Sequence, residues 1–174
     1  MKAAIVLALT LACPAAAAVT GVAPDGFTSQ HDAVIAVPPE QAWSALVAWQ
    51  QWWPPAHSYS GTPPVLVLRA GGGLVETWPG GEVLHATLVN ALPPKLLRLT
   101  GGFGPLQSLP VTAVLDFVLT PVGAGTRIVM TYRVAGNAGA RLDTLATPVD
   151  TVMGEGFARL NRLAVTGAAD ATPE

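Results

Sequence analysis

The sequence predicts an α+β fold, in which an antiparallel sheet of about six to seven strands precedes one long C-terminal helix. Three observations support this prediction. In several segments between residues 30 and 134, apolar and polar residues alternate with the period of two that strands require. The chain contains 18 Gly and 16 Pro, which cluster between those segments as turns. A long helical spacing of apolar residues begins only after residue 147.

Composition limits the classes of protein to which the chain can belong. Its 174 residues are enough for one domain with its own core. Charged residues make up 11% of the chain, less than half of the usual value of roughly 25%, and the net charge is -2. Because Lys and Arg are few and scattered, we expect no nucleic-acid partner. One cysteine excludes a disulfide framework, and the three histidines lack metal-ligand spacing, so no metal or other cofactor is expected.

Residues 1–18 have the pattern of a secretory signal peptide. Lys2 supplies the positive charge, an apolar run without charge follows, and Ala15–Ala18 provide small residues at a cleavage site. The run is shorter than the about 20 residues that span a bilayer. We therefore expect cleavage after Ala18, no transmembrane span in the mature chain, and a periplasmic or secreted location. The alternatives are lipidation at Cys13, although Thr10 fits a lipoprotein signal poorly, and an uncleaved anchor.

The first elements of the mature chain are separated by prolines. Residues 19–28 are interpreted as a lead-in, and the alternating segment Gln30–Val37 as the first strand. Apolar residues at helical spacing predict a short helix over Glu40–Gln51. Pro54 and Pro55 are expected to end it, because the residue before a proline disfavours the helical conformation.

The middle of the chain is predicted to form the rest of the sheet. Gly101–Pro110 is an irregular loop within it. The clearest hairpin has its turn at Gly123-Ala124-Gly125, with apolar residues on one face and polar residues such as Asp116 and Arg133 on the other, where they are read as a surface ion pair. The predicted strands are Val65–Arg69, Leu74–Trp78, Glu82–Asn90, Lys95–Thr100, Val111–Leu119 and Arg127–Val134.

A long helix is predicted to follow, with Thr147 as its N-cap and Gly167 at its end. Gly154 and Gly156 each destabilise a helix by roughly 1 kcal/mol relative to Ala, which is tolerable if another element approaches closely there. Residues 168–174 are interpreted as a flexible tail. The apolar stripe comprises Val149, Val152, Met153, Phe157, Leu160 and Leu163.

This order of elements, together with local motifs, resembles the SRPBCC superfamily of START, polyketide cyclase and heat-shock ATPase-activator-like proteins, as an exported bacterial member. The resemblance covers residues 30–166 and implies a helix-grip domain over 29–167, in which a curved sheet grips the C-terminal helix around an apolar cavity. The superfamily includes carriers, cyclases, hydrolases and co-chaperone domains, so the resemblance does not select an activity. The motifs that carry it are Val37-Pro38-Pro39-Glu40-Gln41-Ala42-Trp43, Trp52-Trp53-Pro54-Pro55-Ala56-His57-Ser58-Tyr59-Ser60-Gly61, Gly104-Pro105-Leu106-Gln107, and Gly125-Thr126-Arg127 leading into Thr131-Tyr132.

Candidate ligand-binding residues are aromatic, flexible apolar or polar side chains expected on the inner face. The aromatic cluster before His57 is read either as the lip of a pocket or as a hydrophobic plug that closes the sheet. Tyr132 is either a ligand donor or a core tyrosine, and Arg98 either a carboxylate anchor or a cross-strand ion pair. The candidates are Trp49, Trp52, Trp53, His57, Tyr59, Trp78, Arg98, Phe103, Phe117, Met130, Tyr132, Met153 and Phe157.

Two residues are weak candidates for acid–base catalysis. If Glu76 points inward, apolar surroundings are expected to raise its pKa, whereas outward it is a solvated strand charge. His57 has no orienting carboxylate nearby in the sequence. His31 and His85 are interpreted as surface histidines.

Three hypotheses for function follow from the sequence. The first is an exported protein that binds a small apolar or amphipathic molecule between the sheet and the C-terminal helix. The second is a cyclase- or hydrolase-type enzyme that uses the same pocket, with Glu76, His57 or Tyr132 as acid–base groups. The third is a structural or interaction domain without a ligand. The oligomeric state is left open.

Overall fold

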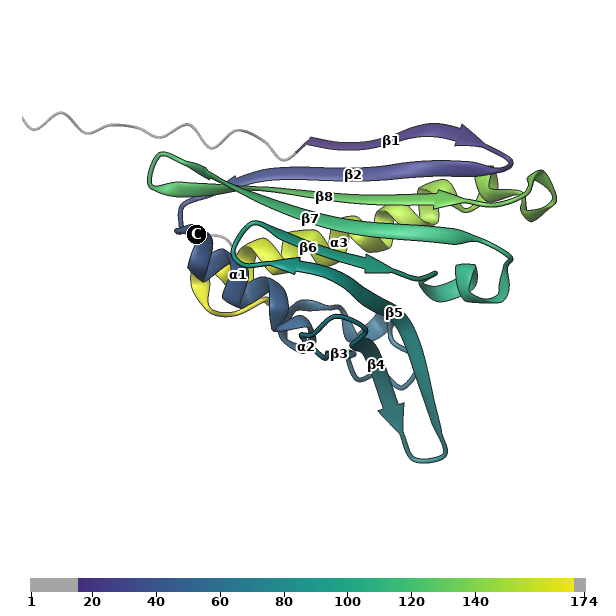
Figure 1. The fold of residues 1–174 in the computed structure, drawn as a ribbon, viewed down its shortest axis with the longest axis horizontal. Helices are drawn as coiled ribbons and strands as arrows, with labels where there is room; N and C mark the ends of the chain where they lie inside the picture. The colour runs from purple at the N-terminus through teal and green to yellow at the C-terminus, as the bar shows by residue number, and fades with distance from the viewer. Residues whose placement is uncertain (1–15, 171–174) are drawn as a thin grey trace, which may run out of the picture.

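The computed structural model describes residues 16–170, which form one eight-stranded antiparallel sheet and three α-helices (Figure 1). The strand order is β1-β2-β8-β7-β6-β5-β4-β3. The strands are β1 (Ala16–Ala23), β2 (Gly26–Ile35), β3 (Val65–Leu66), β4 (Gly73–Trp78), β5 (Gly81–Leu92), β6 (Leu96–Thr100), β7 (Thr112–Val122) and β8 (Gly125–Ala135). The α-helices are α1 (Pro39–Val47), α2 (Trp49–Trp52) and α3 (Ala146–Thr166), and four 3-10 helices cover Pro55–His57, Gly104–Ser108, Ala138–Ala140 and Leu142–Thr144.

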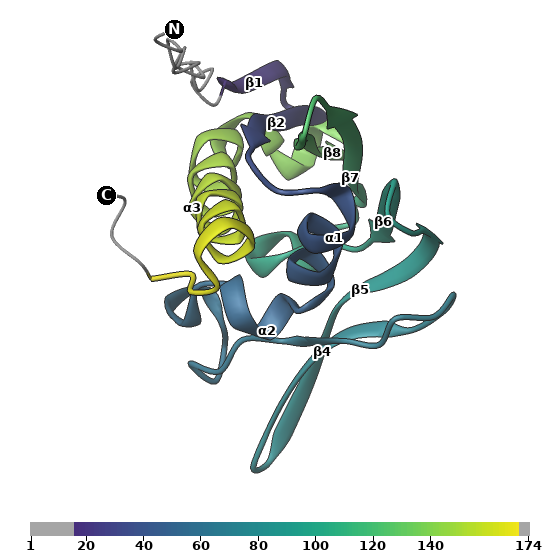
Figure 2. The same cartoon turned by 90° about the vertical axis from the view of Figure 1, so that its left-hand side faces the viewer.

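The sheet curves around α3, with α1 and α2 beside one end of that helix (Figure 2). This arrangement confirms the predicted α+β class and the helix-grip fold. The predicted hairpin is also confirmed, since β7 and β8 pair in register with Leu115 opposite Tyr132 and Phe117 opposite Met130. All four of these side chains are buried, as a one-sided sheet requires.

The N-terminal part of the chain contains more strand than predicted. Most of the segment 19–28 belongs to strands, because β1 extends to Ala23 and β2 begins at Gly26 rather than Gln30. β1 pairs only with β2, so it is an edge strand that gives the sheet eight strands. The predicted signal peptide lies outside the described residues except for Ala16–Ala18, which begin β1.

The predicted strand Val65–Arg69 is wrong beyond Leu66. A tight turn follows, in which Gly72 donates a backbone hydrogen bond of 2.7 Å to the carbonyl of Arg69. A Cβ atom at Gly72 would lie 2.1 Å from the carbonyl oxygen of Val67, so only glycine fits there. The backbone turns instead of continuing as a strand.

The predicted helix over Glu40–Gln51 is two helices, because the backbone breaks at Ala48 (φ -81, ψ 53). The break allows both Trp49 and Trp52 to be completely buried. The indole N–H of Trp52 donates to the carbonyl of Leu46 over 3.1 Å, which satisfies one acceptor released at the end of α1. Burial of two indoles therefore overrides the local helical preference.

Helix α3 begins one residue before its predicted cap. Leu145 occupies the N-cap position without a side-chain hydrogen bond, so Thr147 as the N-cap is wrong. Other elements do approach closely at the two glycines of the helix: a Cβ at Gly154 would lie 2.7 Å from the ring of His31, and one at Gly156 would lie 3.2 Å from the ring of Trp53. Gly167 ends the helix with φ 79, as expected.

Part of the predicted tail is attached to α3. The guanidinium of Arg162 donates to the carbonyl of Ala169 over 2.8 Å, and Arg159 pairs with Asp170. Ala169 is buried. Residues 171–174 lie outside the described part of the chain.

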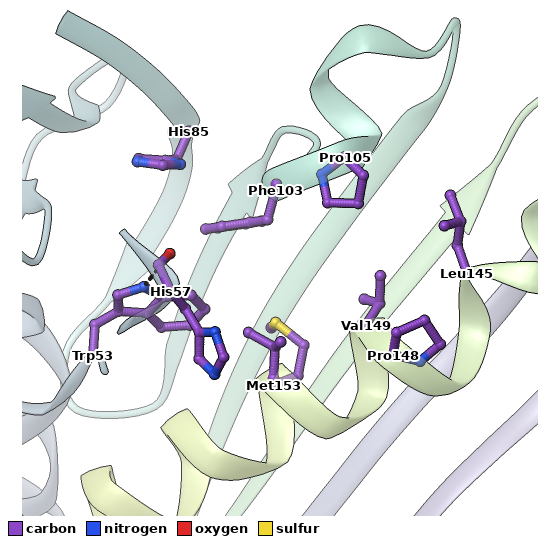
Figure 3. A pocket seen from close by; sticks show the side chains of 11 residues that line it. Trp53, His57, His85, Phe103, Pro105, Leu145, Pro148, Val149 and Met153 are labelled. Carbon is purple, nitrogen blue, oxygen red and sulfur yellow. Dashed lines mark hydrogen bonds between the residues drawn. The ribbon is translucent and has the colours of Figure 1, made fainter. Parts of the chain in front are cut away.

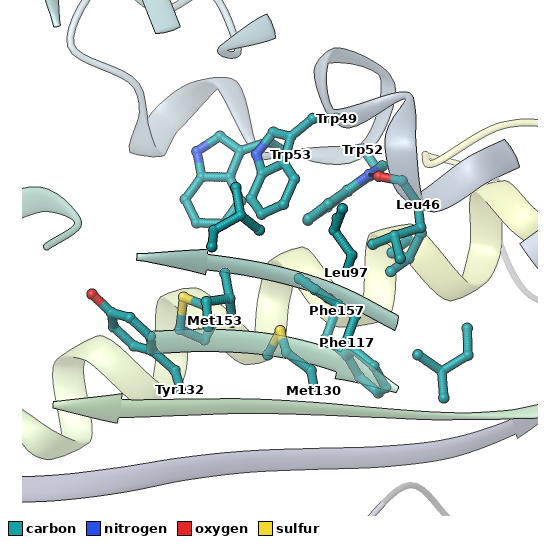
Figure 4. Packing of buried hydrophobic residues seen from close by; sticks show 14 of the residues in the cluster. Leu46, Trp49, Trp52, Trp53, Leu97, Phe117, Met130, Tyr132, Met153 and Phe157 are labelled. Atoms are coloured by element: carbon teal, nitrogen blue, oxygen red, sulfur yellow. Dashed lines mark hydrogen bonds between the residues drawn. The ribbon is translucent and has the colours of Figure 1, made fainter. Parts of the chain in front are cut away.

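The core lies between the concave face of the sheet and the three helices (Figure 4). The ring centroids of Trp49 and Trp52 are 4.3 Å apart, and both rings contact Phe117 of β7. Met130 of β8 and Phe157 of α3 are buried in the same cluster. The aromatic residues of α2 therefore join the helices to the middle of the sheet.

Candidate functional site

A pocket of about 270 Å³ lies between the start of α3, the Gly101–Pro110 loop and the chain after α2 (Figure 3). Its wall is mainly apolar, and it also contains the imidazoles of His57 and His85. The lining residues are Trp53, His57, His85, Phe103, Gly104, Pro105, Leu145, Pro148, Val149, Val152 and Met153.

Four predicted ligand-binding residues line this pocket: Trp53, His57, Phe103 and Met153. Six others form the buried core beside it rather than its wall. These six are Trp49, Trp52, Phe117, Met130, Tyr132 and Phe157. The aromatic segment thus has two roles, since Trp49 and Trp52 fill the core while Trp53 faces the pocket.

Two further candidates, Tyr59 and Trp78, are not among the lining residues. The Tyr59 side chain is exposed, and its hydroxyl lies 3.2 Å from the side-chain oxygen of Gln107 at the outer edge of the loop. Trp78 covers Gly81 at the end of the β4–β5 hairpin, where a Cβ at Gly81 would lie 2.7 Å from the indole. Figure 1 shows this hairpin extending away from α3.

Arg98 lies on the opposite face of the sheet from the pocket, because its neighbours Leu97 and Leu99 are the residues of β6 that point into the core. Its guanidinium donates to Asp116 of β7 over 2.6 Å, and Arg133 of β8 donates to the same carboxylate. Arg98 is therefore in a cross-strand ion pair and does not anchor a ligand in the pocket.

The predicted pair of Asp116 and Arg133 is present, but Asp116 is buried rather than on the surface. Burial alone would raise the pKa of Asp116, but the hydrogen bonds and charges of Arg98 and Arg133 outweigh burial and lower it. The outer face of the sheet thus holds one buried carboxylate between two partly exposed guanidinium groups.

Glu76 points inward from β4 and is 2% exposed. Its carboxylate accepts hydrogen bonds from the backbone N–H groups of Tyr59, over 3.1 Å, and of Ser60. Burial tends to raise the pKa of Glu76, but the hydrogen bonds from Ser60, His85 and Tyr59 outweigh it and lower the pKa. The raised pKa expected for an inward orientation is therefore wrong, because three donors converge on the carboxylate.

His85 is the partner of Glu76, and it is buried rather than on the surface as predicted. Its Nε2 atom lies 3.0 Å from a carboxylate oxygen of Glu76. The imidazole is stacked on Phe103 and also contacts the ring of Tyr59. The sequence did not identify His85 as a site residue, since its burial depends on residues from three other segments.

His57 has an orienting carboxylate that the local sequence did not reveal. Its Nε2 atom lies 2.8 Å from Glu155 of α3, 98 positions away in the chain. Both side chains are partly exposed at the rim of the pocket. The indole N–H of Trp53 donates to the carbonyl of His57 over 3.4 Å, which connects the rim to the pocket wall (Figure 3).

Tyr132 is a core tyrosine whose hydroxyl is satisfied by the loop. It donates to the carbonyl of Gly101 over 3.0 Å and accepts from the backbone N–H of Phe103 over 3.2 Å. Burial raises the pKa of Tyr132, so it remains a phenol. Its role is to hold the loop that places Phe103 in the pocket wall.

His31 is also buried, contrary to the surface prediction. Its Nε2 atom lies 2.9 Å from Asp150 of α3, which in addition accepts a hydrogen bond of 2.6 Å from Ser29. These residues join β2 to α3 and do not line the pocket. Within residues 16–170, no three His, Cys, Asp or Glu side chains are grouped as they would be to hold a metal ion.

None of the helices in the described range, α3 included, combines the length and the apolar character needed to cross a membrane.

The pocket residues that the sequence did not single out as ligand contacts include Val149 and Val152, although both were placed on the apolar stripe of α3. The stripe was the signal that could have identified them. Leu145 and Pro148 complete the same end of the pocket.

Solved structures share this fold at low sequence identity. CalU16 from Micromonospora echinospora superposes with a TM-score of 0.61 at 15% identity, covering 92% of this chain and 88% of that protein. Protein MLL2253 from Mesorhizobium loti gives a TM-score of 0.58 at 21% identity, covering 78% of this chain and 95% of that protein. Protein Ms6760 from Mycobacterium smegmatis also gives 0.58, at 20% identity, with 86% and 98% covered. These likenesses establish the fold alone.

The sequence itself matches one protein family. No curated protein matches the chain. Residues 27–165, most of the chain, match the family described as polyketide cyclase / dehydrase and lipid transport. The chain therefore belongs to this polyketide cyclase/dehydrase and lipid transport family of the SRPBCC superfamily.

Proposed function

We propose that the chain is an exported binding protein for a small, mainly apolar molecule held in the pocket between the Gly101–Pro110 loop and α3. The observation that carries this proposal is the apolar pocket itself. A concave, mainly apolar pocket of about 270 Å³ beside a fully packed core has the usual character of a small-molecule site. The family description, which includes lipid transport, supports the same class of function.

The size of the pocket limits the ligand. Pockets for drug-sized molecules are roughly 300–1,000 Å³, so this pocket of about 270 Å³ is just below that range. A two-ring aromatic compound or a short-chain amphiphile fits that description, whereas a complete phospholipid does not. Affinity would come from burial of apolar surface, at about 25 cal/mol per Å².

The pocket has a polar end and an apolar end (Figure 3). His57 and His85 lie near Trp53 at one end, while Leu145 and Pro148 lie at the other. A ligand with an apolar body and one polar group would therefore bind in a single orientation. Its polar group would face the imidazoles, which avoids burying an unpaired hydrogen-bonding group against the apolar end.

Export is the second part of the proposal. It is supported by the n-region, the apolar run and the small residues of the first 18 positions. Location in the periplasm or outside the cell would give the protein access to small apolar molecules that cross the cell envelope.

Calorimetric titration with 2-naphthol tests the binding function. We expect saturable binding to the wild-type protein and loss of binding in Val152→Trp, because an indole at this position would occupy the pocket. Val165→Trp is the matched control, since Val165 is an exposed residue of the same helix outside the pocket wall. If 2-naphthol does not bind, or if it binds equally well to both variants, the pocket is not the site.

A further inference from the structure

His85 is a buried histidine with only one of its two ring nitrogens in use. Nε2 interacts with Glu76 over 3.0 Å, and no residue in the range 16–170 is a partner of Nδ1. The side chain is 4% exposed, and it lines the pocket. Among the described residues, the fully buried side-chain N and O atoms without a partner belong to Trp49, Ser58 and Asn161 and not to His85, so Nδ1 is still accessible. Because His85 lines the pocket, this nitrogen is available to a molecule bound there.

The surroundings of Glu76 determine which nitrogen of His85 carries the proton. Both carboxylate oxygens of Glu76 accept backbone N–H groups, one from Tyr59 and one from Ser60, so the carboxylate acts as an acceptor throughout. Nε2 must then be the donor in its contact with Glu76. A neutral imidazole with its proton on Nε2 has an acceptor lone pair on Nδ1.

The ring of His85 is also fixed in orientation. Phe103 stacks on it with the centroids 6.0 Å apart and the planes 15° from parallel, and the ring of Tyr59 lies 5.9 Å away. A 180° flip of the imidazole would keep both aromatic contacts but would place Cε1 where Nε2 lies, so the hydrogen bond to Glu76 would be lost. In the neutral ring, Nδ1 is thus held as an acceptor.

We propose that Nδ1 of His85 accepts a hydrogen bond from the ligand, so that the pocket selects small apolar molecules that carry a hydroxyl donor, namely a phenol, an enol or a protonated carboxylic acid. This inference rests on the proposed binding function and names the class of ligand. His57 does not provide the same selection, because its side chain and that of Glu155 are partly exposed at the rim and remain in contact with water. A ligand without a donor would cover the Nδ1 acceptor of His85 and leave it unpaired, which weakens binding of such a ligand.

Three naphthalenes of similar size test the inference by calorimetric titration. 2-Naphthol has a hydroxyl donor, 2-methoxynaphthalene keeps the oxygen but has no donor, and 2-methylnaphthalene has neither. We expect 2-naphthol to bind about tenfold more tightly than the other two, which is the effect of one well-formed hydrogen bond. Equal affinity of 2-naphthol and 2-methoxynaphthalene would overturn the inference and leave the binding function standing. If none of the three binds, the binding function itself fails and the inference fails with it.

His85→Gln tests the residue. Glutamine places an amide donor where Nε2 lies, so the hydrogen bond to Glu76 is retained, but the acceptor at Nδ1 is removed. We expect the preference for 2-naphthol over 2-methylnaphthalene to fall below about threefold, less than the contribution of one hydrogen bond. The matched control is His31→Gln, because His31 is equally buried beside a carboxylate but lies outside the pocket wall. The control should keep the full preference.

A measurement on the wild-type protein does not depend on how the variants fold. Nitrogen-15 NMR of the histidine ring should show the proton of His85 on Nε2, and addition of 2-naphthol should shift the Nδ1 resonance while 2-methylnaphthalene leaves it unchanged. A proton on Nδ1 in the free protein, or the same shift with both compounds, would contradict the proposal.

Discussion

Glu76 is a buried carboxylate whose charge is stabilised by hydrogen bonds from two backbone N–H groups and His85. Glutamine has the size of glutamate, but its amide N–H₂ group would point at groups that are themselves hydrogen-bond donors. We expect Glu76→Gln to lower the free energy of unfolding by about 1–3 kcal/mol at pH 7. Glu82→Gln on the exposed side of β5 is the control and should change it by less than about 0.5 kcal/mol. Urea denaturation measures both.

The wild-type protein and the Glu76→Gln variant also give a prediction for the pH dependence of stability. The pKa of Glu76 is lower in the folded protein than its ordinary value of 4.5, so its stabilising contribution is complete above pH 4.5 and is lost as the pH falls through the folded pKa. The difference in unfolding free energy between wild type and Glu76→Gln should therefore shrink below pH 4.5. A difference that stays constant from pH 7 to pH 3 would show that the carboxylate is not stabilised by its charge. The comparison cancels the other carboxylates, including Asp116.

For single residues, the sequence indicated which residue types could form a site better than it predicted the burial and the contacts of each side chain. The strand pattern left open whether Glu76 points inward, because its environment is made by backbone groups of Tyr59 and Ser60, which no periodicity reveals. His85 was interpreted as a surface residue for the same reason: its burial is set by Phe103, Tyr59 and Glu76 together. Trp53 and Phe103, which were predicted to contact a ligand, do lie in the pocket wall, and large aromatic residues near loops commonly line such sites.

Helix α3 is held against the sheet by a close approach at Gly154. An alanine in a helix interior normally stabilises it by about 1 kcal/mol relative to glycine. Here the added Cβ would lie 2.7 Å from Cε1 of His31, whose ring is fixed by Asp150. We expect Gly154→Ala to lower the thermal stability, with a change of about 1–3 kcal/mol in unfolding free energy.

A double variant separates this clash from other effects. In a His31→Ala background the ring is absent, so Gly154→Ala should be neutral or stabilising, and the two changes should be strongly non-additive. Thermal unfolding of the four proteins in the cycle gives the coupling energy. If alanine at position 154 destabilises the protein equally in both backgrounds, the ring of His31 is not what requires glycine.

Strands β6, β7 and β8 share the ion cluster of Arg98, Asp116 and Arg133 on the outer face of the sheet. Either partly exposed arginine alone can neutralise the buried carboxylate, so Arg98→Gln and Arg133→Gln should each lower the unfolding free energy by less than about 1 kcal/mol. The double variant leaves Asp116 buried without a cation and should lose more than the sum of the two, by about 1–2 kcal/mol. Additive values in urea denaturation would mean that each arginine acts separately.

Helices and strands could be predicted where a pattern of neighbouring residues in the sequence determines them. The β7–β8 hairpin has alternating residues and a glycine turn, and its position follows from sequence alone. The break between α1 and α2 was not predictable, because it arises when Trp49 and Trp52 pack against Phe117, a residue of a distant strand. The predicted N-cap of α3 was wrong for a similar reason, since the first turns of this helix are joined to β2 by the contacts of Asp150 with Ser29 and His31, which are distant in sequence.

On the scale of the whole molecule, the pairing of β2 with β8 joins the N-terminal part of the chain to its last strand. Helix α3 then crosses the concave face, and its first two turns meet the Gly101–Pro110 loop at the pocket (Figures 1 and 3). The pocket is therefore formed by segments that are far apart in sequence. For this reason the sequence could predict a cavity only through a family resemblance, and could not specify its walls.

Because β1 lies at the edge of the sheet, the effect of removing the predicted signal peptide on stability can be predicted. Cleavage after Ala18 would remove Ala16–Ala18 from β1, whose strand partner is β2, and would leave Val19 as the first residue, packed against the core and opposite Ser29. Since cleavage shortens a strand at the edge of the sheet, a chain that begins at Val19 should retain the fold, with an unfolding free energy at most about 2 kcal/mol below that of a chain that begins at Ala16. Intact-mass analysis of protein recovered from the periplasm of a bacterial host should give the mass of the Val19 chain. A mass that includes the first 18 residues would contradict export by cleavage, and a lipid-modified chain that begins at Cys13 would show that the protein is anchored to the membrane instead.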